Sequence, residues 1–165
     1  MFLEDKFLAF AHRGGNEFAP ENSFKAFESA VNIGYKYLET DVHLTKDGFL
    51  IAFHDDSLDR VTNKSGFIRD LTLNEIKKAK IGGSEEIPLL SELLISFPNC
   101  FFNIDCKVDE TVKPLINLLK NSEFLNRVCI GSFSQKRINF IRSSLGNDIK
   151  TSMGPAEVIV SKFLS

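Results

Sequence analysis

The stretch YLETDVHL, residues 37–44, places two carboxylates inside an otherwise apolar run. The run is typical of a strand, and side chains two positions apart in a strand point to the same face. Glu39 and Asp41 therefore share one face. Alternating acids often mark a solvated strand face, but Leu38 and Val42 flank this pair, which disfavours simple solvation. The stretch predicts a strand that presents paired carboxylates at a functional site.

Segments typical of strands and helices alternate on both sides of this stretch. The predicted strands are residues 7–12, 37–44, 49–54, 101–106, 128–132 and 149–153. The predicted helices are residues 24–33, 72–80, 88–95, 112–121, 135–143 and 156–164. This alternation indicates an α/β fold with a parallel sheet. Neither an internal repeat nor an interdomain linker is evident, so residues 1–165 are interpreted as one domain.

Composition argues against several classes of protein. The chain has 165 residues, 20 Lys and Arg against 22 Asp and Glu, and a net charge of −2, so no basic excess points to a nucleic-acid partner. Its three cysteines include no C-x-x-C pair, which disfavours a disulfide framework or zinc site and indicates a reducing, cytoplasmic location. The acidic N-terminus lacks the basic region of a signal peptide, and no apolar run approaches the ~18 residues of a membrane span.

Polar residues gather where the predicted strands end. The carboxyl ends of parallel strands form one rim in an α/β fold, and that rim holds the active site. In chain order these residues are His12-Arg13, Glu39, Asp41, His54-Asp55, Asn103, Asp105 and Lys107.

The residue types at this rim suggest an anionic substrate and a metal ion. Three neighbouring carboxylates, Glu39, Asp41 and Asp105, repel one another unless a cation lies between them, and oxygen ligands favour a hard ion such as Mg²⁺ or Ca²⁺. Arg13 and Lys107 are suited to bind phosphate, the first as a planar fork and the second as a point charge. Taken alone, Asp105 is equally an ordinary salt-bridge partner of Lys107.

Two histidines supply groups that titrate near neutral pH. A lone histidine at a strand end is usually structural, but His12 and His54 occupy matching positions at two strand ends. With a reference pKa near ~6.5, one imidazole can accept a proton while the other donates one. His43 is interpreted as structural, because nothing else points to it. The histidine pair, the cations and the carboxylates together indicate phosphodiester cleavage.

The ordered set of motifs resembles the glycerophosphodiester phosphodiesterase family. Each segment is weak by itself, whereas the set in this order, from residue 12 to about residue 133, is specific. The matching segments are His12-Arg13-Gly14-Gly15, Pro20-Glu21-Asn22-Ser23, Glu39-Thr40-Asp41-Val42, Thr45-Lys46-Asp47-Gly48, His54-Asp55-Asp56-Ser57-Leu58-Asp59-Arg60-Val61-Thr62, Gly66, Ile87-Pro88-Leu89, Asn103-Ile104-Asp105-Cys106-Lys107 and Ser132-Phe133.

The resemblance implies a TIM barrel that hydrolyses small glycerophosphodiesters to sn-glycerol 3-phosphate and an alcohol. It assigns acid and base catalysis to His12 and His54, without saying which is which, and phosphate binding to Arg13 and Lys107.

The resemblance also implies one divalent cation, Mg²⁺ or Ca²⁺, held by Glu39, Asp41 and Asp105. The family pattern N-x-E-x-K normally has glutamate at the third position, and this chain has Asp105 there. The shorter side chain withdraws the carboxylate by roughly 1.5 Å. The ion, the backbone or a water molecule must make up that difference.

A TIM barrel usually takes roughly 250 residues and eight β/α units. With six predicted strands in 165 residues, the expected fold is a TIM-type (β/α)8 barrel truncated after about six units, without its C-terminal strands. Its open edges, residues 7–12 and 149–153, then favour self-association. The short link between Asp41 and His54 has no helical pattern, so residues 42–48 are expected to run back down the barrel wall and turn at its bottom.

Two alternatives stay open beside an active phosphodiesterase. One is a truncated, non-catalytic remnant that binds ligand or a partner chain. The other is a phosphodiesterase of the same fold that acts on lysophospholipids, because the alcohol side of the substrate is recognised by loops that this chain only partly contains.

Overall fold

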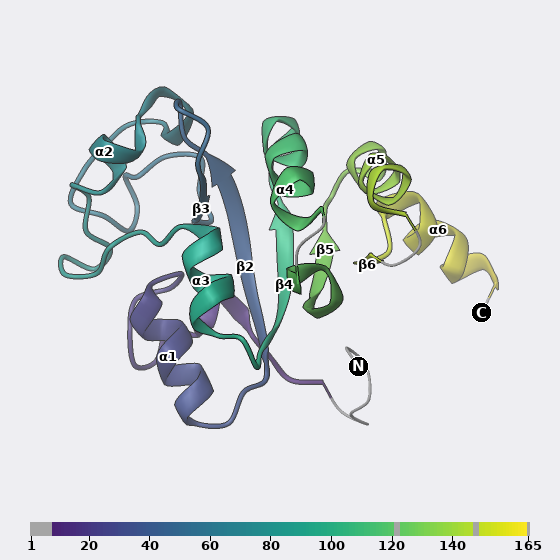
Figure 1. The fold of residues 1–165 in the computed structure, drawn as a ribbon, viewed down its shortest axis with the longest axis horizontal. Helices are drawn as coiled ribbons and strands as arrows, with labels where there is room; N and C mark the ends of the chain where they lie inside the picture. The colour runs from purple at the N-terminus through teal and green to yellow at the C-terminus, as the bar shows by residue number, and fades with distance from the viewer. Residues whose placement is uncertain (1–7, 121–122, 147–148, 165) are drawn as a thin grey trace.

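A computed structural model describes residues 8–120, 123–146 and 149–164, in which strands and helices alternate (Figure 1). The strands are β1 (Phe10–Ala11), β2 (Tyr37–Leu44), β3 (Leu50–Ala52), β4 (Phe101–Cys106), β5 (Val128–Gly131) and β6 (Lys150–Thr151). The α-helices are α1 (Phe24–Asn32), α2 (Leu73–Ile76), α3 (Leu90–Ser96), α4 (Val112–Leu119), α5 (Gln135–Leu145) and α6 (Pro155–Leu164). Short 3-10 helices are η1 (His12–Gly14), η2 (Ile68–Asp70), η3 (Asp109–Thr111) and η4 (Glu123–Arg127). Phe7 and Asn121, which were included in predicted elements, lie outside the described residues.

The sheet has the strand order of an incomplete TIM-type barrel. Within the described residues, β1, β2, β4, β5 and β6 follow one another as parallel neighbours, and β3 pairs only with β2. The expectation of a truncated α/β barrel is therefore confirmed. Of the six predicted strands, five run parallel, and the third is an antiparallel addition to β2.

The predicted course of residues 42–48 is wrong. Val42 to Leu44 continue β2 upward beyond Asp41, and the chain then turns and returns as β3, with Val42 opposite Ala52 and Leu44 opposite Leu50. The turn is closed by a hydrogen bond from the Thr45 amide to the Phe49 carbonyl. The core covers both strands of the hairpin, since Val42, Leu50 and Ala52 are buried in it.

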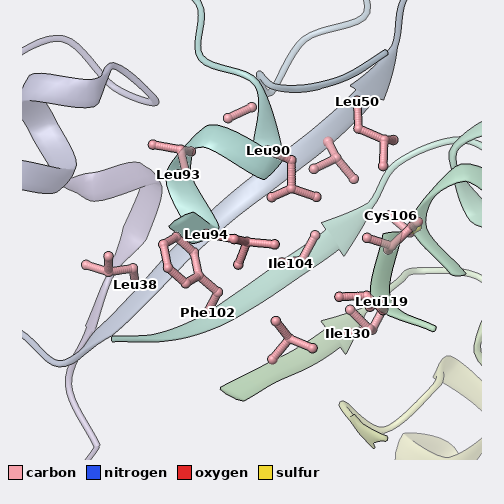
Figure 2. Close-up of a cluster of buried hydrophobic side chains, with 14 of the residues drawn as sticks. Leu38, Leu50, Leu90, Leu93, Leu94, Phe102, Ile104, Cys106, Leu119 and Ile130 are labelled. Atoms are coloured by element: carbon pink, nitrogen blue, oxygen red, sulfur yellow. The ribbon is translucent and has the colours of Figure 1, made fainter. Parts of the chain in front are cut away.

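Alternation along β2, β4 and β5 separates an apolar face from a polar one. Leu38, Phe102, Ile104 and Ile130 point outward from the sheet and pack against the covering helices. Figure 2 shows α3 laying Leu90, Leu93 and Leu94 on this face. Residues of the opposite parity, including the two carboxylates of β2, therefore face the barrel interior.

A second apolar cluster supports the excursion between β3 and α3. This cluster consists of Ile51, Phe53, Leu58, Ile68, Ile76, Ala79, Ile81 and Ile87. The helix predicted for residues 72–80 is shorter than expected and ends at Ile76, although Thr72 and Glu75 form a capping box at its start. Its continuation is prevented because the Lys80 amide donates to the Asn63 side chain and Ile81 pairs with Glu85.

The turn after β1 packs directly on α1, whose start is capped by Ser23. Gly14 has φ +75°, and a Cβ at this position would lie 2.9 Å from the Phe27 nitrogen. Only glycine accommodates both the left-handed backbone and this close approach. The contact fixes the turn that carries His12 and Arg13.

Within the described residues, β1 and β6 each have a single neighbouring strand, and apolar side chains are exposed beside β6. We expect the 165-residue chain, produced alone, to self-associate through these edges, because unpaired edges and apolar surface favour pairing with another copy. Light scattering across a concentration series measures this. Ile159→Glu on α6 should weaken association. Ile95→Glu, at a similarly exposed position on α3 over the middle of the sheet, should leave it unchanged. A chain that stays monomeric at every concentration would contradict the expectation.

Candidate active site

The side chains predicted to act in catalysis, phosphate binding and metal binding all line one cavity of about 760 Å³. The cavity lies at the carboxyl ends of the strands, where the polar face of the sheet meets the loops that follow. Its predicted members are His12, Arg13, Glu39, Asp41, His54, Asp105 and Lys107. The structure thus brings together residues from four separate segments, and their individual roles stay predictions.

The register of β2 and β4 places two carboxylates side by side. Asp41 is paired with Asp105, and both are buried. Lys107 bridges them, since its Nζ lies 2.8 Å from Asp41 Oδ1 and 3.1 Å from Asp105 Oδ2. Burial by itself would lower the pKa of Lys107, but the hydrogen bonds to the two carboxylates outweigh it and raise the pKa. Lys107 is therefore a firmly charged ammonium at the centre of the site.

Glu39 lies deeper along the same strand face and carries a strongly shifted pKa. Its pKa is raised from 4.5 to about 7, chiefly by burial, next by the charge of Asp41 and to a smaller extent by the charge of Asp105. The Arg13 amide donates to Glu39 Oε2 at 2.9 Å and opposes this shift only in part. The three carboxylates, if all ionised, carry one more charge than the two cations in the cavity, Arg13 and Lys107.

The turn η1 aims the backbone and side chain of Arg13 at these carboxylates. Arg13 has φ 54°, a left-handed conformation that is uncommon outside glycine, and its carbonyl accepts a hydrogen bond from the Asn22 amide at 2.8 Å. Its Nε lies 3.4 Å from Asp41 Oδ2. The neighbouring His12 is largely exposed, with Nε2 3.8 Å from Glu39 Oε2. The strained turn therefore places a guanidinium inside the cavity and an imidazole at its mouth.

His54 reaches the same cavity from the end of the β2–β3 hairpin. Its Nδ1 lies 2.6 Å from Asp55 Oδ1. Asp55 also accepts hydrogen bonds from Arg60, which in turn donates to Glu21. From the sequence alone, no role was assigned to Glu21, Asp55 or Arg60. All three lie in the motif segments, and this was the feature of the sequence that could have pointed to them.

His43 has the structural place expected for it. Its imidazole is buried, which lowers its pKa, and its Nε2 donates to the His54 carbonyl at 3.0 Å. The contact ties β2 to the segment that carries His54. His43 does not line the cavity.

The carboxylates of the site are incompletely hydrogen-bonded. As the side chains stand, no group of three or more potential ligands among the described residues is gathered closely enough to hold a metal ion. Asp41 Oδ2 and Asp105 Oδ1 are nevertheless buried without a hydrogen-bond partner in that part of the chain. Buried carboxylate oxygens in this state are costly, and an all-oxygen donor set suits a hard divalent cation. The donor chemistry therefore fits such an ion.

Comparison with known proteins now settles the family. The model of the glycerophosphoryl diester phosphodiesterase family matches residues 12–163. The chain belongs to this family. A protein named probable glycerophosphodiester phosphodiesterase 2 from Mycobacterium tuberculosis is 39% identical over 131 residues, covering 79% of this chain and 50% of that protein. A glycerophosphodiester phosphodiesterase from Caldanaerobacter subterraneus is 38% identical over 151 residues, covering 83% and 62%.

Solved structures of the family share the fold. A phosphodiesterase from Oleispira antarctica, solved with the product sn-glycerol-3-phosphate, superposes with a TM-score of 0.80 at 27% identity, covering 96% of this chain and 72% of that one. The chain spans between half and two thirds of the length of the two curated relatives. The described residues contain no helix that is both long and apolar enough to cross a membrane.

The raised pKa of Glu39 predicts a pH-dependent stability for the metal-free chain. Between pH 4.5 and about 7 the folded chain keeps a proton on Glu39 that the unfolded chain releases. The free energy of unfolding therefore falls as pH rises through this window, by up to about 3 kcal/mol. Glu39→Gln should remove this term and flatten the profile. Urea unfolding without divalent ions at about pH 5 and about pH 8 measures it.

Glu110→Gln, a change of the same type at an exposed position outside the cavity, serves as the control and should retain the wild-type slope. Equal slopes for wild type and Glu39→Gln would show that Glu39 does not titrate in this way.

Proposed function

We propose that this chain forms the catalytic part of a metal-dependent glycerophosphodiester phosphodiesterase. It would hydrolyse a small glycerophosphodiester to sn-glycerol 3-phosphate and an alcohol. The observation that carries the proposal is the convergence of two histidines, two cations and three carboxylates on one cavity in a member of this family. The Oleispira antarctica relative, whose structure contains sn-glycerol-3-phosphate, supports the class of ligand.

The proposal includes one divalent cation, Mg²⁺ or Ca²⁺, held by Glu39, Asp41 and Asp105. It is supported by the buried oxygens of Asp41 and Asp105 that lack a hydrogen-bond partner among the described residues, and by the raised pKa of Glu39. When bound, such an ion offsets the carboxylate charge and polarises a phosphoryl oxygen. The family usually has a glutamate at the position of Asp105. The family pattern therefore says least about how this carboxylate would reach the ion.

The two cations in the cavity are placed to bind a phosphodiester. An ammonium has three N–H donors, and the two carboxylates bonded to Lys107 leave one for a further anion. A guanidinium has five, so Arg13 retains donors beyond the one that meets Glu21. Both groups can therefore hold phosphate oxygens while they stay anchored to the protein.

The two histidines are proposed to move the protons of the reaction. Asp55 occupies Nδ1 of His54, so Nε2 is the atom through which His54 accepts or donates a proton. His12, which is exposed at the cavity mouth, is within reach of solvent and of an incoming substrate. One imidazole activates the attacking group and the other protonates the leaving alkoxide.

A second candidate substrate class, lysophospholipids, is favoured by the apolar side of the cavity. Phe133, Met153 and Ile159 line it and are 84%, 51% and 58% exposed. Such a wall suits the acyl chain that a lysophospholipid carries on its glycerol side. The three cysteines are free thiols, which supports the proposed cytoplasmic location.

Turnover of glycerophosphocholine and lysophosphatidylcholine tests the proposed reaction. His12→Ala and His54→Ala should each lower kcat by ~10²-fold or more, as expected when general acid or base catalysis is lost. Arg13→Ala and Lys107→Ala should raise KM and also lower kcat, because the charge on the phosphoryl group changes in the transition state. Lys113→Ala, at an exposed position on α4, is the matched control and should behave as wild type. Wild-type rates in both histidine variants would rule out the mechanism, and ligand binding without turnover would favour the non-catalytic alternative.

Metal binding is tested independently of activity by thermal unfolding and calorimetry. Mg²⁺ or Ca²⁺ should raise the unfolding temperature, with about 2.7 kcal/mol gained at a hundred times the dissociation constant. Asp105→Asn should weaken this effect, whereas Asp105→Glu should preserve or improve affinity. Asp109→Asn is the control, because Asp109 lies outside the cavity and pairs with Arg137. The absence of binding at millimolar concentrations of both ions would refute the metal site.

A further inference from the structure

Three charged side chains outside the predicted site connect His54 with Arg13. Arg60 donates to Glu21 through Nη2 at 2.6 Å and through Nη1 at 3.3 Å. On its other side Arg60 donates to Asp55, through Nε at 2.5 Å and through Nη2 at 3.1 Å. We call this arrangement the Glu21–Arg60–Asp55 bridge. Both of its carboxylates are engaged by two donors of one planar guanidinium, a geometry that defines orientation as well as distance.

The ends of the bridge contact the two functional groups that must cooperate in the proposed reaction. Asp55 Oδ1 lies 2.6 Å from His54 Nδ1, and Glu21 Oε1 accepts from Arg13 Nη1 at 3.0 Å. Glu21 and Arg60 are 39 positions apart in the chain. The bridge therefore joins the segment before α1, which packs on the phosphate-binding turn, to the loop after β3, which carries a proton-transfer group.

Isolated ion pairs at a protein surface contribute little, but this bridge differs from them. Arg60 itself is 48% exposed, but Glu21 and Asp55 are only 18% and 21% exposed, and each accepts from two partners. Hydrogen bonding by Arg60 lowers the pKa of Asp55, and His54 lowers it further. Asp55 is thus a carboxylate, which only accepts hydrogen bonds. The proton between Asp55 and His54 consequently belongs to His54 Nδ1.

We infer that Glu21, Arg60 and Asp55 are positioning residues for the proposed phosphodiesterase reaction. Asp55 holds His54 in the Nδ1–H tautomer and leaves Nε2 as the proton-transfer atom. Arg60 fixes the Asp55 carboxylate, and Glu21 ties the same guanidinium to Arg13, so the phosphate-binding and proton-transfer groups keep one relative orientation. The inference rests on the proposed function for its catalytic meaning, whereas the tautomer it assigns is a property of the folded chain alone.

The structure contains an internal reference for this tautomer. His43 Nε2 contacts the His54 carbonyl, which only accepts, so His43 is the opposite tautomer with its proton on Nε2. The chain has three histidines. Two of them are therefore expected to show opposite, fixed tautomers in one spectrum, and His12, which is largely exposed, supplies a solvent-averaged comparison.

Long-range ¹H–¹⁵N NMR of the imidazole nitrogens tests the inference on the full 165-residue chain at mildly alkaline pH. Each resonance is assigned by replacing one histidine at a time. His54 should show Nδ1–H and His43 should show Nε2–H. Asp55→Ala should release His54 into a mixture of tautomers while the His43 pattern stays unchanged, which also verifies that the variant is folded. A mixed or Nε2–H tautomer for His54 in the unmodified chain would overturn the inference.

Substitutions of Arg60 separate geometry from charge. Arg60→Lys keeps the positive charge but loses the planar fork. It should therefore lower the population of the Nδ1–H tautomer of His54 nearly as much as Arg60→Ala does. Full retention by lysine would show that charge alone suffices and would refute the positioning role of the fork. Arg69→Ala is the control, because Arg69 lies in the same excursion but stacks over Phe67 instead of contacting the bridge.

Kinetics connects the bridge to the reaction. Arg60→Ala should lower kcat for glycerophosphocholine by about 10- to 100-fold, the scale expected of a misplaced catalytic group. Glu21→Gln should act mainly on KM through Arg13. A fixed His54 tautomer in a chain without turnover would refute the proposed function and leave the assigned tautomer standing. Turnover that is insensitive to Arg60→Ala would refute the positioning role and leave the proposed function standing.

Discussion

The parallel pairing of β2 with β4 is the constraint on which the site depends. Neighbouring strands lie about 4.8 Å apart, so the pairing of Asp41 with Asp105 forces two carboxylates together. This register is held from the other face of the sheet, where Leu38 and Phe102 are fully buried against the helices. A slip by one residue would turn these apolar side chains into the polar interior. Core packing thus holds in place an arrangement of charges that is unfavourable by itself.

The repulsion among these carboxylates explains the character of the surrounding residues. Buried charges are costly unless they are paired, and Lys107 between Asp41 and Asp105 supplies part of that pairing. Arg13 supplies another part through its backbone amide to Glu39 and its side chain near Asp41. The remaining imbalance, expressed in the pKa of Glu39, is the physical basis for proposing a divalent cation. The repulsion among the carboxylates therefore lowers the stability of the free chain and, for the same reason, would favour binding of an ion.

His54 shows how a short, irregular segment places a catalytic group. β3 runs antiparallel to β2 and ends just before His54, and a separate apolar cluster supports the excursion that follows it. His43 fixes the His54 backbone from β2, and Asp55 fixes its ring from the adjacent position. The imidazole is thus oriented by groups on both sides, whereas His12 at the cavity mouth is largely exposed. The two histidines accordingly differ in how tightly the protein holds them.

The sequence by itself determined the elements whose signals are local. Alternation in residues 37–44 predicted a strand with carboxylates on one face. A common rim was predicted from the strand-end positions of His12, Arg13, Asp105 and Lys107. The ordered motifs predicted the family. Only the tertiary structure decided the direction of β3 and the partners of Arg60. The pattern of residues 42–48 is extended, but strand periodicity does not show whether an extended segment runs up or down the barrel wall. Burial of the β2–β3 hairpin decided that this segment continues β2 upward. Glu21 and Arg60 are 39 positions apart, and a salt bridge at that separation exists only where packing of α1 and the excursion brings both side chains to one place.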